Sequence, residues 1–121
     1  MTTITIPQTT LAIGAHSFGP AAVPNGAAFV TIAIDRTVTG GLNSLTTSTT
    51  LTLDVFESLD GGATFILAGE ALCVGGSFTE HGVPLNANDL GVMIYPGATH
   101  AKASITIAGT SVTVAGTLTI Q

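Results

Sequence analysis

Three carboxylates lie close together in the sequence, and paired carboxylates are the groups that hydrolyse glycosidic bonds. They are Asp54, Glu57 and Asp60. That reaction needs two carboxyl groups that converge on one bond. Apolar and polar residues alternate over 51–55, which predicts a strand with Asp54 and Glu57 on opposite faces, and Asp60 belongs to the turn that follows. We therefore expect no glycosidase site and no enzymatic activity.

The histidines and serines do not form a recognisable centre either. His16, His81 and His100 are spread over the chain without the short spacing of metal ligands such as His-x-His. They are interpreted as solvated loop histidines, although His81 beside Glu80 could form a ligand pair with a third residue. The serines lack the nucleophile elbow of a hydrolase. We expect no catalytic residue, no metal site and no cofactor.

Oxygen-bearing loop residues are a candidate for calcium. Asp60, Asn86, Asn88 and Asp89 carry the ligand atoms that Ca²⁺ prefers. The same residue types bond their own backbone in Asx turns, which is the interpretation we favour. A calcium-stabilised adhesin-like domain is therefore kept only as a third hypothesis.

Tyr95 is the one candidate for contact with a glycan. Sugar-binding surfaces use exposed aromatic rings, and this chain has no Trp and a single Tyr. Tyr95 stands directly before Pro96 and Gly97, where a turn is expected. A carbohydrate-binding module is thus the alternative function.

The composition describes a molecule with a sparsely charged exterior. The 121 residues fit one domain, 1–121, and only 7% of them are charged, against about 25% in an average protein. Small Thr, Ala, Gly and Ser side chains take the place of charges, and such a surface packs readily against another copy. We expect a homo-oligomer or a component of a larger assembly. A small acidic monomer from a halotolerant or secreted source is the other interpretation.

The net charge of −5 excludes several classes of partner. Two basic residues, Arg36 and Lys102, cannot neutralise a phosphate backbone, so no nucleic acid is expected.

No apolar run approaches the roughly 18 residues of a membrane span, so no membrane partner is expected. Residues 1–7 lack the features of a conventional signal peptide. Cys73 is unique in the sequence, can form no internal disulfide, and is predicted to be a buried small hydrophobe.

Alternating segments joined by turns make up most of the chain. One hairpin is predicted over 51–67, with Asp60, Gly61 and Gly62 in its turn, and the clearest signal is a second hairpin over 102–120. A strand is also predicted over 29–36, and a separate short one over 71–74 before Gly75 and Gly76. Residues 1–10 are predicted to be an edge strand or an N-terminal arm, and 14–26 a loop, since that segment contains Gly-Pro and Pro-Asn-Gly. The pattern predicts an all-β protein, an antiparallel β-sandwich of about seven to nine strands with Ig-like or jelly-roll topology.

The turn after residue 57 resembles a single Asp-box, the hairpin turn that is repeated around sialidase-type propellers. The matching residues are Ser58, Asp60, Gly62, Thr64 and Phe65, with Phe65 where that family usually has Trp. In that family the box is a structural turn and not the catalytic centre. The resemblance therefore implies a structural role for these residues and no enzyme.

Taken as a whole, the chain resembles the small β-sandwich structural proteins encoded in tailed-phage morphogenesis regions. The resemblance rests on the strand that ends in Ile34-Asp35-Arg36, the Glu57-to-Gly62 turn, the Gly75-Gly76 break and the closing 103–120 hairpin. It implies a non-enzymatic virion protein of the capsid decoration type, made in the host cytoplasm. The implied partners are the major capsid protein, another virion protein or further copies, often as trimers.

Overall fold

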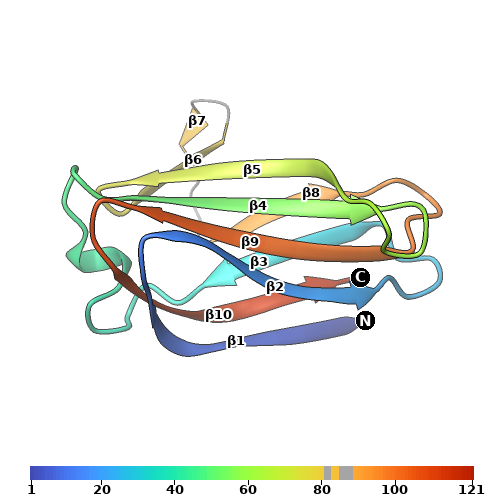
Figure 1. Ribbon diagram of the computed structural model, residues 1–121, viewed down its shortest axis with the longest axis horizontal. Helices are drawn as coiled ribbons and strands as arrows, with labels where there is room; N and C mark the ends of the chain where they lie inside the picture. The colour runs from blue at the N-terminus through green and yellow to red at the C-terminus, as the bar shows by residue number, and fades with distance from the viewer. Residues whose placement is uncertain (81–82, 85–88) are drawn as a thin grey trace.

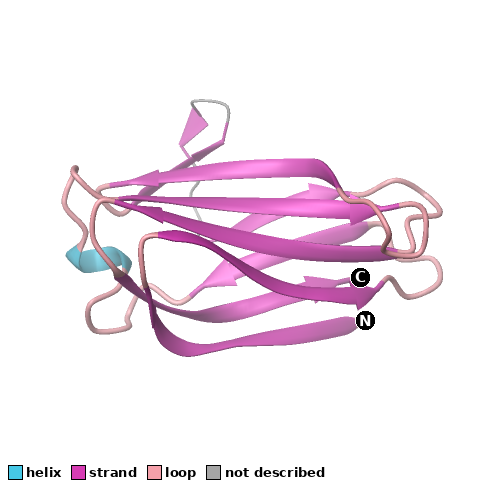
Figure 2. Ribbon diagram, in the orientation of Figure 1, coloured by secondary structure: helices cyan, strands magenta, loops and turns pink. Residues whose placement is uncertain are grey.

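The computed structural model describes residues 1–80, 83–84 and 89–121, and strands in two stacked layers dominate it (Figure 1, Figure 2). One layer has the strand order β1-β10-β3-β8 and the other the order β2-β9-β4-β5-β6-β7, with antiparallel pairing throughout the described residues. The strands are β1 (Thr2–Leu11), β2 (Gly14–Ala22), β3 (Phe29–Ile34), β4 (Thr50–Ser58), β5 (Ile66–Val74), β6 (Ser77–Glu80), β7 (Val83–Pro84), β8 (Asp89–Met93), β9 (His100–Ala108) and β10 (Val112–Ile120). One turn of 3-10 helix, η1 (Leu42–Ser44), precedes β4. The predicted all-β sandwich is confirmed.

The path of the chain identifies the sandwich as a jelly roll. Strands β1, β2, β3 and β4 alternate between the two layers, and β8, β9 and β10 do so again. The first and last strands pair with each other, as Thr2 lies opposite Ile120. Two sheets of four strands linked in this way form the eight-stranded double Greek key, to which the β6–β7 hairpin adds an extension. The sequence left Ig-like and jelly-roll topologies open, and the strand order selects the second.

The core lies between the layers and follows from the period-2 pattern. In β4 the side chains of Leu51, Leu53 and Val55 are completely buried, and those of Ile105 and Ile107 in β9 lie beside them. Thr50 and Thr52 of β4 and Thr106 of β9 occupy alternate positions and are only partly buried, where β-branched Thr suits the pleated surface. Cys73 is buried among these apolar groups, as predicted.

The predictions for two segments, 14–26 and 71–74, gave too little strand. Residues 14–22 are the strand β2 and not a loop, because β2 is an edge strand whose register shifts between Phe18 and Ala21, which accommodates Pro20 without loss of a central ladder bond. The expected short strand over 71–74 is the second half of β5, which begins at Ile66. With the two short strands β6 and β7, the described count is ten rather than seven to nine.

The predicted break at Gly75 and Gly76 is a two-residue hairpin turn between β5 and β6. Both residues have positive φ, 59° and 86°, as a type I′ turn requires. The edge prediction for residues 1–10 also holds, since β1 is the outer strand of its sheet and pairs with β10. The loops after β2, β4 and β8 gather at one end of the sandwich, together with both chain termini (Figure 1).

Candidate functional site

The Asp-box-like turn between β4 and β5 is built from its own side chains. Asp60 Oδ1 accepts hydrogen bonds from Ser58 Oγ at 2.7 Å and from the Thr64 backbone N–H at 2.9 Å, and Oδ2 accepts one from the Thr64 hydroxyl. Ser58 Oγ in turn accepts the Gly62 N–H at 2.9 Å. Gly61 and Gly62 have positive φ values of 78° and 91°, a conformation that residues with a Cβ atom rarely adopt. The turn is therefore a closed structural unit, and both oxygens of its carboxylate accept hydrogen bonds from within it.

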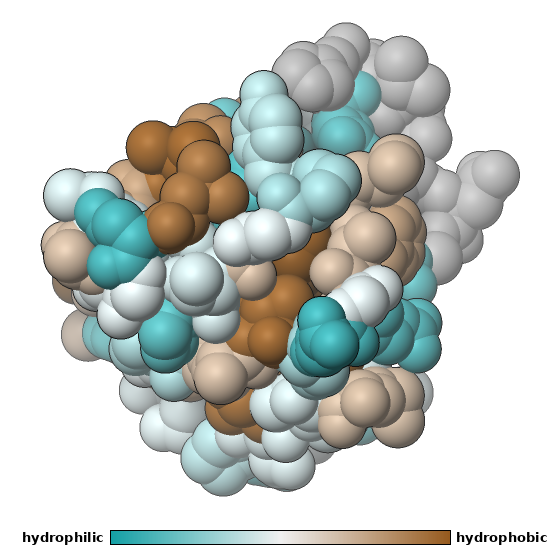
Figure 3. Space-filling model, turned by 90° about the vertical axis from the view of Figure 1, so that its right-hand side faces the viewer, coloured by the Kyte–Doolittle hydropathy of each residue, from teal (hydrophilic) through white to brown (hydrophobic). Residues whose placement is uncertain are grey.

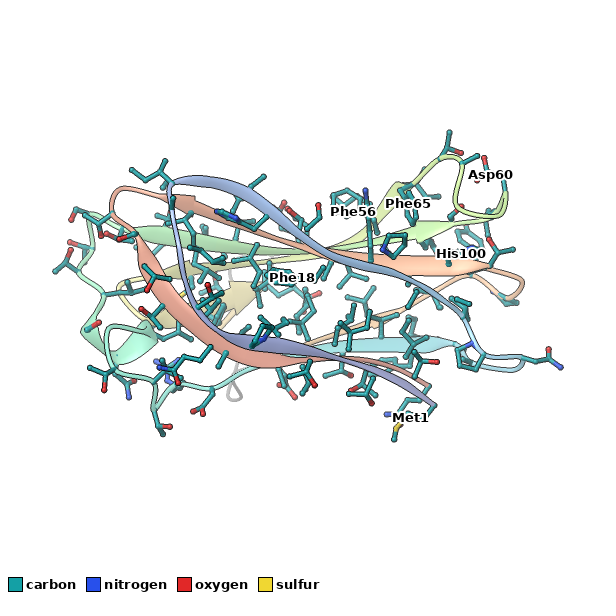
Figure 4. The ribbon with its side chains drawn as sticks, turned by 60° about the horizontal axis from the view of Figure 1, so that its bottom comes forward. Met1, Phe18, Phe56, Asp60, Phe65 and His100 are labelled. Carbon is teal, nitrogen blue, oxygen red and sulfur yellow. The ribbon has the colours of Figure 1, made fainter. Side chains whose placement is uncertain are left out.

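The β8–β9 connection locks this turn in place. Thr99 Oγ1 accepts the Gly61 N–H at 2.9 Å and donates to the Ser58 carbonyl at 3.2 Å. The His100 ring lies against Gly62, and His100 Nδ1 is 3.1 Å from Thr99 Oγ1. Figure 4 shows His100 below the turn that carries Asp60. His100 is thus part of a structural network rather than a free loop residue.

The hydrogen bonds from Thr64 and Ser58 lower the pKa of Asp60 to about 2. Because folding depresses this pKa, the stability that the carboxylate provides is complete above its ordinary value near 4 and is lost as the pH falls toward 2. Asp60→Asn should lower the melting temperature at pH 7, and the difference from the parent should shrink as the pH approaches 2. Asp89→Asn, at an exposed carboxylate, is the control and should leave the pH 7 melting temperature nearly unchanged. Equal melting temperatures for Asp60→Asn and the parent at pH 7 would contradict this role.

A hollow of about 340 Å³ opens beside the turn, where the two sheets part. Its lining comes from the end of β4, the first residues of β5 and the segment around the end of β8, namely Glu57, Leu67, Ala68, Met93, Ile94, Tyr95 and Pro96. The Glu57 side chain is only 4% exposed, and its Oε2 accepts the Tyr95 backbone N–H at 2.8 Å. Tyr95 itself is 62% exposed. Figure 3 looks at this end of the sandwich, where brown apolar groups reach the surface between polar ones.

The predicted separation of Asp54 and Glu57 is confirmed. Glu57 points inward to the hollow, whereas Asp54 lies on the outer face of β4, opposite Glu70 of β5. The expected absence of a glycosidase arrangement rests on that separation and on the engagement of Asp60. Sequence reasoning missed the pairing of Asp54 with Glu70, since a one-residue bulge in β5 sets it.

Burial, a hydrogen bond to Glu70 and repulsion from its carboxylate together raise the pKa of Asp54 to about 7. Asp54 Oδ1 is buried and has no hydrogen-bond partner among the described residues. A carboxyl group whose pKa rises on folding binds its proton more tightly in the folded state, so stability should fall as the pH rises from about 4 through 7. Two carboxylates that face each other across paired strands repel, and this repulsion also lowers the stability of the folded state as the pH rises.

Asp54→Asn should therefore stabilise the protein at pH 8, and should stabilise it clearly less at pH 5. The gain should be about 1 kcal/mol, after allowance for solvent screening of a partly exposed pair. Asp35→Asn is the matched control, because Thr37 lowers the pKa of Asp35 and its loss should not stabilise at pH 8. Urea unfolding at the two pH values measures both variants. A stabilisation that is equal at pH 5 and pH 8 would refute the proton linkage.

The single lysine lies between two aromatic rings on the same outer face. Lys102 Nζ is 4.5 Å from the centroid of the Phe65 ring and 5.5 Å from that of Phe56, and Figure 4 shows the two rings near each other. Such cation–π contacts stabilise a cation over a ring face. Phe65, which stands where an Asp-box usually has Trp, thus contributes its ring to Lys102.

The remaining candidates do not assemble. His16 Nε2 donates to the Ala12 carbonyl at 2.8 Å in the neighbourhood of the β1–β2 turn, remote from His100. His81, Asn86 and Asn88 lie outside the described residues. Asp89 begins β8, whereas the Asp60 turn lies beyond the end of that strand. Within residues 1–80, 83–84 and 89–121, no group of three or more His, Cys, Asp or Glu side chains could hold a metal ion.

Comparisons with known proteins add no family to these observations. No protein-family model matches the chain, and no curated protein matches it at a significant level. Among the described residues, no helix combines the length and apolar character needed to traverse a bilayer.

Proposed function

We propose that this chain is a non-enzymatic structural protein of a tailed-phage virion, a capsid decoration or stabilising subunit that packs on the capsid lattice or on its own copies. The observation that carries the proposal is an eight-stranded jelly roll in a chain of which only 7% of the residues are charged. Jelly rolls of this kind occur in viral capsid proteins and in lectins. That is an analogy of fold, and the partner must be argued from the surface.

The exposed edge of β1 supports a role in assembly. β1 is ten residues long and carries no charged side chain, whereas soluble monomers usually protect such an edge with lysines or other charges. Pro7 and the register shift between Ile6 and Thr9 are its only interruptions. A neighbouring subunit can add a strand to an edge of this type. Directly after β1, the side chain of Ile13 is 64% exposed.

Sedimentation with capsids tests the proposal. Particles assembled from the major capsid protein encoded nearest to this chain should retain it through a sucrose gradient, in a fixed ratio to the capsid subunit. Analytical ultracentrifugation of the chain alone should show an oligomer, with a trimer favoured. A monomer that stays at the top of the gradient would reject the proposal.

A carbohydrate-binding module of a phage host-recognition apparatus is the second candidate. It is favoured by Tyr95, whose exposed ring stands at the rim of the hollow that holds Glu57. A glycan array should then show binding that Tyr95→Ala abolishes, while the oligomeric state of the variant stays unchanged.

A further inference from the structure

The hollow combines the nearly buried carboxylate of Glu57, which lines it, with an exposed apolar rim. Met93 is 77% exposed, Leu67 is 55% exposed, and the Tyr95 ring stands beside them. Ligand pockets usually measure about 300–1,000 Å³, so a volume of about 340 Å³ suits a small group better than a large one. The hollow also adjoins an open sheet edge, since the described pairing of β6 with β5 covers only 72–74 and leaves the first half of β5 accessible.

We propose that this hollow binds a lysine or arginine side chain of a partner protein, with Glu57 accepting the cationic end. Oε2 of Glu57 receives one hydrogen bond, from the Tyr95 N–H. A carboxylate has about four acceptor positions, so capacity for a cationic donor remains. The Glu57 side chain is only 4% exposed, and a carboxylate withdrawn from water gains when a cation lies beside it.

The rim fits the rest of such a side chain. Lysine and arginine carry an apolar stem behind the charged group, and these stems pack along apolar surfaces. Met93 and Leu67 provide that surface, with the adaptable thioether of Met93 at the outer side. The face of the Tyr95 ring can stack on the cation.

This chemistry favours a cationic side chain over a sugar. A sugar ring presents several hydroxyls, each of which needs a polar partner, whereas Glu57 is the one carboxylate in a lining that is otherwise apolar apart from the Tyr95 hydroxyl and backbone groups. The net charge of −5 also attracts cations.

The cation should come from a different protein and not from a second copy. The chain has two basic side chains. Lys102 lies over the rings of Phe56 and Phe65, and Arg36 donates to the Gly76 carbonyl. Both are therefore engaged within their own subunit. An extended segment of the partner can run along the open first half of β5 and place its basic residue in the hollow.

The inference rests on the proposed function only for the source of the partner, a neighbouring virion protein. It is tested with two capped pentapeptides of sequence Thr-Val-X-Val-Thr, in which X is lysine or norleucine. Norleucine keeps the apolar stem and lacks the charge. In NMR titrations the lysine peptide should shift the Tyr95 amide and Met93 methyl signals and bind at least about fivefold more tightly than the norleucine peptide.

Variants assign the preference to Glu57. Glu57→Gln keeps an acceptor for the Tyr95 N–H and should abolish the preference for lysine, whereas the matched Glu70→Gln, at an exposed carboxylate of β5, should retain it. If Glu57→Gln fails to fold, Met93→Ser with Tyr95→Ala replaces it, because both side chains are exposed and their loss should weaken the lysine peptide at least about fivefold.

Three outcomes would overturn the inference. They are equal affinity for the two peptides, an equal loss of preference in Glu70→Gln, and Tyr95 shifts with monosaccharides but not with the lysine peptide. The result can be separated from that of the capsid experiment. Lysine binding without capsid retention rejects the virion role alone, and capsid retention unchanged by Glu57→Gln, together with no peptide preference, rejects the pocket alone.

Discussion

Gly116→Ala should destabilise the protein by at least about 3 kcal/mol, more than the other substitutions considered for this chain. A Cβ at this position would lie 2.1 Å from the Ala33 carbonyl oxygen and 3.2 Å from the Ile34 Cα, both backbone atoms of the neighbouring strand β3. Backbone cannot rotate away as a side chain end can, so β10 and β3 must separate to admit the methyl group. Gly116 also pairs with Ile6 of β1, and the distortion would spread to both neighbours.

Chemical denaturation measures this effect. The urea midpoint of Gly116→Ala should fall strongly, or the variant should be unfolded in water. Thr117→Ala is the control in the adjacent position, since it removes atoms from a half-buried side chain and should cost about 1 kcal/mol or less. If the two variants have the same midpoint, the close approach of β10 to β3 is not as described.

Gly69→Ala should destabilise the protein by about 1–3 kcal/mol, and Val92→Ala should recover part of that loss. A Cβ at Gly69 would meet the Val92 side chain at 2.5 Å, so β5 and β8 are in contact across the sandwich here. Truncation of Val92 removes the obstructing methyl groups. The double variant should therefore be more stable than the sum of the two single effects predicts.

A double-mutant cycle from urea unfolding gives the coupling energy between the two sites. We expect about 0.5–3 kcal/mol, the range for residues in direct contact. A second cycle, with Ala71→Gly in place of Gly69→Ala and again with Val92→Ala, serves as the comparison, because Ala71 lies on the same strand as Gly69. Additive effects at Gly69 and Val92 would mean that the sheets are not pinned at this point, and the wall behind the Glu57 hollow would then be poorly defined.

The alternation of apolar and polar residues predicted the strands because each strand has one apolar face. Over 51–55 and 103–107 the apolar residues fall every second position, and all of them are buried. The Asp60 turn could also be predicted, because the hydrogen bonds within it join residues four or fewer positions apart. Interactions between residues this close in the sequence can be predicted from a short stretch of sequence alone.

The register between strands and the contacts between distant residues could not be predicted from the sequence in this way. Ala68 is an extra residue in β5, since Val55 lies opposite Gly69 and Phe56 opposite Leu67. Without that bulge Glu70 would face Leu53 and the core, because a slip of one residue reverses every side chain. The bulge thus creates the Asp54–Glu70 pair. The contact of Glu57 with Tyr95 joins residues 38 positions apart, one in β4 and the other in the β8–β9 connection, and no pattern in the sequence predicts it.

The engagement of both basic side chains has a consequence for proteolysis. Trypsin cleaves after lysine or arginine, so this chain offers it only Arg36 and Lys102. Lys102 lies within β9, which is paired on both sides, and Arg36 follows β3 and is tied to the carbonyl of Gly76. A protease needs an extended, accessible segment, so cleavage of the folded chain would report local opening at one of two known places. Digestion under native conditions therefore gives a direct readout of how often the end of β3 separates from the β5–β6 turn.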